Sequence, residues 1–351
     1  AWSPDKPQTL TCRRCGVNVP NAQYPAKVEG KILEEVVEVL PRILHKYPYH
    51  SVPPEKQDYP DERIYLAAKR DYEAREFLAK AALYAALRAK KHRQESGPKD
   101  RQESGPKDDP YARMAAVLVL RFAQVYPAYA VRYDQPGQPK YFQRADQPPP
   151  YRRGYRSGKW DWLGCLDVPL NLVLAYACLR GSPAVAEAGA ALGDPHPART
   201  IEHDLFRASA AFVRNQPEEF GEASLLADRG LLAVGRLLND PALVHEAVFR
   251  LEGFAERGFY HDGLWHQGDA SAHRRVLGLI DTWIERLLAG YTDPPGYTPP
   301  GGGRRFEALP GAGAIPMLAL ARRAGAVVLT DPRLPEVQQA SWPAPPAPPS
   351  L

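Results

Sequence analysis

The sequence of 351 residues has few cysteines, little net charge and no long apolar run, and each shortage excludes a class of protein. No apolar stretch approaches the roughly 18 residues that a membrane-spanning helix needs, which predicts that the chain has no membrane span. The formal net charge of +4 is too small to indicate a nucleic-acid-binding protein. No signal peptide is recognisable, and because the chain begins at Ala1 without Met, this says nothing about its compartment.

The cysteines are too few and too scattered for a complete four-cysteine zinc site. Cys12 and Cys15 form a CxxC pair of the kind that binds zinc, but Cys165 and Cys178 lie far away in an apolar helical pattern. We interpret these last two as small buried residues. At Cys12 and Cys15 two alternatives stay open. One is a structural zinc ion completed by a histidine or by ligands upstream, and the other is a pair of free or disulfide-linked thiols.

Strand signals are also scarce, and helical periodicity dominates the chain. The only clear β-branched run is AVVLT at residues 326–330, which predicts a strand. Apolar residues elsewhere recur at helical spacing, without a fixed repeat period of about 20 to 50 residues. We therefore predict an all-α fold of helical hairpins stacked into an incomplete (α/α) toroid or a solenoid. The predicted helices cover residues 27–46, 64–90, 110–125, 167–179, 200–214, 224–238, 241–257 and 272–289.

Loops and a low-complexity tail divide the chain. The octapeptide RQESGPKD at residues 93–100 is repeated at 101–108, which only an exposed loop between helices would tolerate. Residues 291–305 are so rich in Pro and Gly that they predict a linker or lid, and the tail after Asp331 is expected to be disordered. The expected domains are a CxxC lead-in with a first helix at 1–60, a toroid at 61–290, and an extension at 291–351.

The most informative stretch is residues 258–283, GFYHDGLWHQGDASAHRRVLGLIDTW, where three histidines and two Trp residues surround the start of an apolar helix. Asp262-Gly263 predicts a turn, and Ser271 is a suitable cap for the helix that follows. Such a loop and first helical turn, presented by a rigid scaffold, commonly carry binding or catalytic groups. The alternative is an exposed polar connection between two helices.

Three segments together resemble the heparinase II/III-type polysaccharide lyases and the related alginate lyases. The first is the pattern F-x-x-DG-x-W-x-Q-G-x-x-S-x-H at residues 259–273, preceded by the helix pair GLLAVGRLLNDPALVHEAVFRLEGF. The second is the helical segment at 73–129, and the third is CRRCGVNVPNAQYP at 12–25, similar to a lead-in ahead of the family's toroid. The resemblance spans most of residues 10–290. It implies an α/α toroid, and the β-sandwich domain that usually follows it would be incomplete or absent here.

The resemblance implies cleavage of a uronic-acid glycan by β-elimination, which needs a group that neutralises the C5 carboxylate, a base and an acid. The family's Ser-Tyr-His triplet is Ser271-Ala272-His273 here, so Ala272 stands where the catalytic Tyr is expected. His273 is then the best proton-transfer candidate, with Tyr260 as an alternative. The family's Asn-containing motif aligns in two registers that stay open: one makes Asn215 and Gln216 the neutralising pair, and the other puts Glu222 at that position.

Further residues are candidates for lining an anionic-glycan cleft. Trp160 and Trp162 are aromatic platforms for sugar rings, or else apolar caps of the helical domain. A basic run at 152–159 beside them would meet carboxylates or sulfates, or is simply a solvated charged segment. The remaining substrate-binding candidates are Trp265, His266, Gln267 and Arg274. They lie on the same loop and first helical turn as Tyr260 and His273. At Gln267 the family usually has Glu.

Three functions follow as expectations. The first is a polysaccharide lyase that acts on a uronate-containing glycan, sulfated or not, needs no cofactor for catalysis, and is secreted or periplasmic in a bacterium. The second is an inactive or truncated relative that binds anionic polysaccharide without cleaving it, which the loss of Tyr at Ala272 favours. A glycoside hydrolase is the third, because Asp262 with Glu218, Glu219 or Glu222 would supply two carboxylates.

Overall fold

The computed structural model divides the chain into two compact units, Ala1–Cys165 with Gly181–Ile201 and Leu166–Arg180 with Glu202–Leu351. Among the residues that the structure describes, each unit is mostly helical, which confirms the all-α expectation in its coarse form. The residues that the structure describes are 2–11, 16–19, 66–95, 109–129, 131–134, 141–143, 156–158, 160, 168–215, 218, 220–266 and 270–330.

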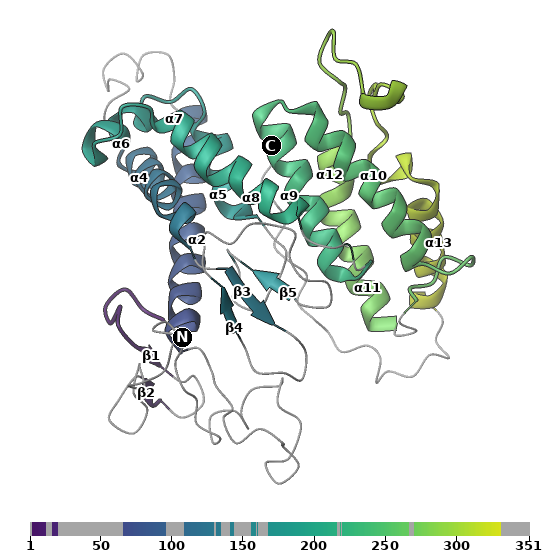
Figure 1. Cartoon of the computed structure of the whole chain (residues 1–351), viewed down its shortest axis with the longest axis horizontal. Helices are drawn as coiled ribbons and strands as arrows, with labels where there is room; N and C mark the ends of the chain where they lie inside the picture. The colour runs from purple at the N-terminus through teal and green to yellow at the C-terminus, as the bar shows by residue number, and fades with distance from the viewer. Residues whose placement is uncertain are drawn as a thin grey trace. The chain divides into compact units, whose positions relative to one another are not determined.

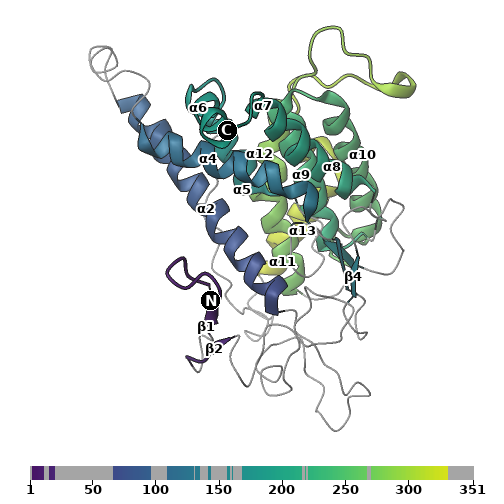
Figure 2. The same ribbon diagram turned by 60° about the vertical axis from the view of Figure 1, so that its left-hand side comes forward.

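The first unit is built around a pair of long helices, α2 (Leu66–Glu95) and α4 (Pro110–Val125), which pack along each other (Figure 2). Alanines are prominent among the buried residues of both helices, since Ala82 and Ala86 of α2 and Ala115 and Ala116 of α4 are fully buried. Small side chains allow two helix backbones to approach closely. Asp109 starts α4, because its carboxylate accepts hydrogen bonds from the backbone N–H groups of the first turn, and Pro110 follows at the first helical position.

Short helices and strands complete the first unit. The three-stranded sheet has the order β4 (Tyr141–Gln143), β3 (Val131–Asp134), β5 (Arg156–Gly158), with all neighbours antiparallel and Tyr133 of β3 opposite Tyr141 of β4. These strands are not predictable from the sequence, because each is too short to show an alternating pattern. Their bounds are β1 Leu10–Thr11, β2 Asn18–Val19, β3 Val131–Asp134, β4 Tyr141–Gln143 and β5 Arg156–Gly158, and the helices are η2 Tyr126–Ala128, α6 Ala184–Leu192 and α7 Pro197–Thr200.

In the second unit α9 and α10 form an antiparallel helical hairpin, and α13 packs against α10 and α11 (Figure 1). The hairpin between α9 and α10 is tight: Asn239 takes a left-handed conformation at φ 52°, and Asp240 then caps α10 through the Leu243 N–H. The elements of this unit are α5 Leu170–Leu179, η3 Ile201–Arg207 leading into α8 Ala208–Arg214, α9 Glu222–Leu238, α10 Pro241–Gly258, α11 Ala270–Leu279 continuing through η4 Ile280–Ile284 into α12 Glu285–Leu288, η5 Pro300–Gly302, η6 Gly311–Ala314 and α13 Pro316–Thr330.

Periodicity located most of these helices within a few residues of their observed bounds. The helix predicted at 27–46 lies outside the described residues, as do residues 96–108 of the duplicated loop and the tail after 330. The strand predicted at 326–330 is wrong, because these residues end α13. Tertiary packing overrides the β-branched propensity there. Leu318 and Ala321 earlier in the helix are fully buried, and Gly325 lies against Leu277 of α11.

The Pro- and Gly-rich segment after α12, for which a linker or lid was expected, folds back on itself and packs against α10. Gly290 N–H donates to Leu309 O, Leu309 N–H donates to Tyr291 O, and Asp293 N–H donates to Phe306 O. Asp293 is buried and contacts His245 of α10. Residues 291–330 therefore belong to the second unit, although irregular backbone was correctly expected at 291–305 apart from the short turn η5.

Candidate functional site

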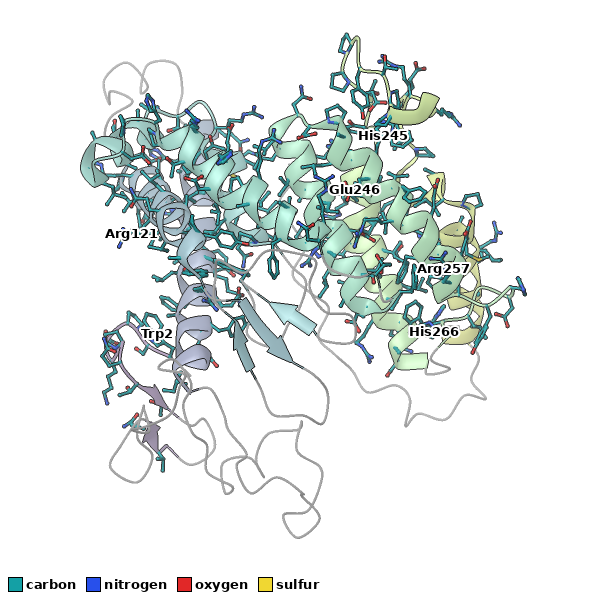
Figure 3. The ribbon with its side chains drawn as sticks, viewed as in Figure 1. Trp2, Arg121, His245, Glu246, Arg257 and His266 are labelled. Carbon is teal, nitrogen blue, oxygen red and sulfur yellow. The ribbon has the colours of Figure 1, made fainter. Side chains whose placement is uncertain are left out.

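The two segments singled out in the sequence meet at one end of the second unit. The two-residue connection between α9 and α10 makes this pair antiparallel, so the start of α9 lies beside the end of α10, and the contact of Arg275 with Glu222 brings the start of α11 to the same end. Figure 3 shows Arg257 and His266 at this end and His245 toward the other end of α10. We call it the α9–α11 end, and its described residues are Glu218, Phe220–Glu222, Arg257–His266 and Ser271–Arg275.

Side chains link the three elements directly. Arg275 Nε of α11 lies 3.5 Å from Glu222 Oε2 at the start of α9, and Arg275 Nη1 donates to Ser271 Oγ at 3.2 Å. The guanidinium of Arg257, at the end of α10, lies 4.4 Å from the centroid of the Phe220 ring. Residues 53 positions apart in the sequence thus contact each other at this end.

A tight turn presents the polar groups of the segment after α10. Tyr260 N–H donates to Leu264 O at 2.8 Å, and Leu264 N–H donates to Asp262 Oδ1 at 2.9 Å. Gly263 takes a left-handed φ of 87°, as the Asp-Gly dipeptide predicted. The turn leaves the Tyr260 side chain 55% exposed, and the Tyr260 hydroxyl donates to His266 O at 2.9 Å. His261 is also exposed.

Beneath the turn lies an aromatic core that includes Trp265, one of the predicted sugar-binding residues. Trp265 is only 2% exposed, and its ring centroid lies 5.4 Å from Phe254 and 5.2 Å from Phe259. The indole also occupies the space beside Gly258, where an added Cβ would come within 2.6 Å of the Trp265 ring. The face of this indole is therefore occupied by the protein. His266 is half-buried, and its Nδ1 donates to Gly258 O at 3.0 Å.

His273, the predicted proton-transfer residue, is 2% exposed. Its Nδ1 accepts a hydrogen bond from Trp265 N–H at 3.1 Å, so the proton of the neutral ring sits on Nε2, which faces Ala321 and Gly325 of α13. Burial lowers the pKa of His273, with the nearby Ala321 carbonyl and Asp262 opposing that shift. Ala272, at the expected Tyr position, is 3% exposed. Neither residue presents a group to solvent.

Two of the remaining predicted residues have local structural partners instead of a place in the site. Asn215 ends α8, and its Nδ2 donates to Ala211 O at 2.8 Å, so its side chain is engaged at the end of its own helix. Trp160 lies in the first unit, is 5% exposed, and donates through Nε1 to Glu76 Oε1 at 3.3 Å, which fits packing better than a platform. Arg274 is exposed at the α9–α11 end.

Several expectations fall on residues outside those that the structure describes. They concern Gln216, Trp162, Gln267, Cys12 and Cys15. Among the described residues, no group of three His, Cys, Asp or Glu side chains is arranged to hold a metal ion. The zinc expected at the CxxC pair therefore stays a prediction.

A buried charge cluster under this end was not anticipated. Arg250 of α10 donates through Nε to Asp228 Oδ1 at 2.9 Å, and its Nη2 lies 3.1 Å from Glu218 Oε2. Glu218 also accepts from the Ser224 hydroxyl and from Phe220 N–H, which fixes the loop before α9. Asp228 is fully buried, and this burial raises its pKa to about 7 even though Arg250 acts in the opposite direction. The sequence does contain one sign of this cluster, because Asp228 is an aspartate inside the apolar run LLADRGLL.

The described residues include no helix that is both long and apolar enough to cross a membrane. Comparison of the whole chain with protein-family profiles, with curated proteins and with solved structures finds no match. The similarity to the heparinase II/III-type lyases therefore rests on the sequence motifs alone and stays a prediction.

Proposed function

We propose that the protein binds an anionic polysaccharide at the α9–α11 end without cleaving it. The observation that carries this proposal is the convergence of the two motif segments, joined by the contact of Glu222 with Arg275. Arg257 and Arg274 are exposed there, beside the exposed phenol ring of Tyr260. Guanidinium groups are suited to carboxylates and sulfates, and aromatic rings with a polar tip are suited to sugars.

Binding without cleavage is favoured because the groups needed for elimination are not presented together. His273 is buried and already accepts a hydrogen bond, and the expected Tyr position holds the buried Ala272. The amide of Asn215 is engaged with the carbonyl of its own helix. A base must lie within hydrogen-bond reach of the proton that it removes. The buried His273 cannot reach a substrate bound at the surface, and Ala272 has no side-chain group that could act as a base.

Lyase activity on a uronate-containing glycan, sulfated or not, is the second candidate function. Tyr260 favours it, because this residue places a phenol on the same surface as Arg274 and Arg275. A phenol can serve as base and acid in an elimination, and a guanidinium can neutralise the C5 carboxylate. No cofactor is needed for this chemistry. The proposal also includes an incomplete α/α toroid and a secreted or periplasmic location in a bacterium, both implied by the resemblance.

The test measures binding and cleavage on the same panel of heparin, heparan sulfate, chondroitin sulfate, hyaluronan and alginate. Calorimetry reports binding, and ultraviolet absorbance of the unsaturated uronate reports elimination. We expect binding of at least one polymer and a flat absorbance trace. Replacing Arg257 and Arg274 together by Gln should weaken binding, whereas Arg121→Gln, which removes an exposed arginine from α4, should not. An absorbance rise that Tyr260→Phe abolishes would establish the lyase instead, and no binding at all would overturn both candidates.

A further inference from the structure

Exposed apolar side chains gather on one side of the helix pair α2 and α4 in the first unit. Tyr84 of α2 is 69% exposed, and Tyr111 and Met114 of α4 are 43% and 46% exposed. Arg88, one turn after Tyr84, lies over the Tyr111 ring at 5.6 Å from its centroid, and Met114 follows Tyr111 by one turn. The side chains are therefore neighbours, and a contiguous exposed apolar patch indicates an interaction surface.

The charge on this side of the helix pair is positive. Residues 78–95 of α2 include five Lys or Arg residues and one Glu. The helix α4 contains neither Asp nor Glu. Glu187 of α6, which packs against α4, lies 3.9 Å from Arg113 and thus already has a cationic partner. An acidic and partly apolar surface would complement this side of the pair.

Tyr84, Arg88 and Lys91 lie on one stripe of α2, because steps of four and three residues stay on the same side of a helix. The Arg88 guanidinium contacts no carboxylate of the described residues. Lys91 lies 3.5 Å from Glu95, but these side chains are 69% and 65% exposed, so the pair contributes little and either partner is easily exchanged. We call Tyr84, Arg88, Lys91, Tyr111 and Met114 the basic face.

A surface of opposite charge lies on α10 of the second unit. Phe249 is 74% exposed, the largest exposed fraction among the large apolar side chains of the described residues. Glu252 and Glu256 are exposed three and seven residues later, on the same stripe of the helix. Neither carboxylate forms an ion pair with a described residue. Burial raises the pKa of Glu252, and the charge of Glu256 acts in the same direction. A cation from outside would relieve this repulsion.

The other charged side chains of α10 have partners away from this stripe. Glu246 lies 2.7 Å from Arg214 of α8. Arg250 belongs to the buried charge cluster, and the guanidinium of Arg257 lies over the Phe220 ring before α9. The stripe therefore keeps the negative charge of its two glutamates beside an exposed aromatic ring. We call Phe249, Glu252 and Glu256 the acidic face.

We propose that the basic face of one copy of this chain binds the acidic face of a second copy. Each face presents an aromatic ring, then a charge one turn later and a second charge two turns later, over about 10 Å of helix. The signs of the charges are opposite and the spacings agree when the two helices run parallel. The contacts are then Phe249 with Tyr84, Glu252 with Arg88, and Glu256 with Lys91.

The association does not depend on polysaccharide. Because the two faces differ, each copy contributes its basic face to one contact and its acidic face to another. Exposed ion pairs contribute little each, so burial of the Phe249 ring supplies much of the affinity and the charges supply the specificity. A contact of this size is weak, and we expect a Kd of the order of 10 µM.

The test is analytical ultracentrifugation of the full chain without polysaccharide, from about 1 to about 200 µM. The mass of the wild type should rise with concentration and fall when salt is added, because salt screens exposed charges. Arg88→Glu with Lys91→Glu should stay monomeric, and so should Glu252→Lys with Glu256→Lys. Mixing these two double variants should restore association, since the unchanged acidic face of the first meets the unchanged basic face of the second.

Three further variants separate the contact from general effects of charge and folding. Arg199→Glu with Arg304→Glu makes the same change in net charge at exposed arginines outside both faces, so it should associate like the wild type. Phe249→Ala should weaken association about three- to tenfold at low and high salt without lowering the melting temperature, because the ring is exposed. Tyr260→Ala, which removes another exposed ring, should leave association unchanged.

The outcomes that would overturn the proposal are equally definite. A wild type that stays monomeric over the whole range would exclude the contact between copies. Association that survives either charge swap, or a mixture of the two double variants that stays monomeric, would show that the basic and acidic faces are not what joins the copies.

Discussion

His245 Nε2 of α10 lies 2.9 Å and 3.0 Å from the two carboxylate oxygens of Asp293, 48 residues later in the chain. The imidazole stacks on Phe306 with ring centroids 3.9 Å apart and planes within 5° of parallel. Asp293 also accepts a hydrogen bond from Phe306 N–H at 2.8 Å. One buried carboxylate therefore joins residues 293 and 306 of the 290–309 segment to each other and to His245 of α10. This relationship explains why a segment rich in Pro and Gly is held in place.

Replacing Asp293 by Asn should therefore destabilise the second unit. The amide still offers one acceptor, but the charge-assisted bonds to His245 and Phe306 N–H are weakened inside a buried site. We expect a loss of about 2 to 4 kcal/mol in the free energy of unfolding, measured by urea titration. Glu307→Gln, an exposed change in the same segment, is the control and should have no measurable effect. Equal stability of the two variants would contradict the role given to Asp293.

The same carboxylate should make stability depend on acid. Burial by itself would raise the pKa of Asp293, but the hydrogen bonds from Phe306 N–H, His245 and Tyr291 together hold it below the ordinary value. A depressed pKa stabilises the fold above the unfolded-state pKa of about 3.9, and this stabilisation is lost as pH falls through the folded-state pKa. In acid titrations followed by circular dichroism, the wild type should lose stability below about pH 4 more steeply than Asp293→Asn. Parallel curves would show that Asp293 is not responsible.

Asp228 should produce the opposite pH dependence. Burial raises its pKa to about 7, above the unfolded-state value, so its contribution is most favourable below about pH 4 and declines as pH rises toward 7. The Asn side chain of Asp228→Asn cannot ionise, so the stability of the variant relative to the wild type should increase between about pH 4 and about pH 7, the interval between the unfolded-state and folded-state pKa values of Asp228. Urea titrations at each pH measure this difference. Asp281→Asn, whose carboxyl is 52% exposed, should show no comparable trend.

His273 is expected to stabilise the fold by accepting the hydrogen bond from Trp265 N–H, and two variants of His273 test this role. His273→Ala leaves Trp265 N–H without its partner and opens a cavity, so it should cost about 2 to 4 kcal/mol. Asn can place an oxygen near the position of Nδ1, so His273→Asn should recover about 1 kcal/mol of that loss. Urea unfolding followed by tryptophan fluorescence measures both. Equal losses in the two variants would exclude the acceptor role, and any effect of His273→Ala on activity must be judged against this loss of folding.

The sequence predicted the helices well because their apolar positions recur over ten residues or more, as in α9 and α10. It predicted the Asp262-Gly263 turn because that dipeptide has its own local chemistry. It could not separate surface from core within the motif. Trp265 and His273 are as polar and aromatic as their exposed neighbour Tyr260. Only tertiary packing decides that they are buried, Trp265 against Phe254 and Phe259 and His273 against α13.

Pairs that are distant in the sequence were beyond prediction for a different reason. His245 and Asp293 belong to a helix and to an irregular segment, and no periodicity relates the two. Arg250 is one of several charged residues on α10, and its selection of Asp228 depends on how α9 packs against that helix. In each case the partner is set by tertiary packing. Local patterns contain no information about it.

The glycine at the tip of the turn offers a test of how tightly the α9–α11 end is built. Gly263 has a left-handed φ of 87°, and an added Cβ would lie 3.0 Å from the Leu320 carbonyl oxygen of α13. Gly296 has a similar φ of 80° but nothing within 4 Å of an added Cβ, so Gly296→Ala measures backbone strain alone, about 1 kcal/mol. Gly263→Ala should cost about 2 to 3 kcal/mol in thermal or urea unfolding, because the helix backbone must also move. It should weaken polysaccharide binding as well, since Tyr260 and His261 are carried by this turn, whereas Gly296→Ala should leave binding unchanged. Similar stabilities for the two variants would mean that the turn is not clamped by α13, and that the site is not held rigidly by the fold.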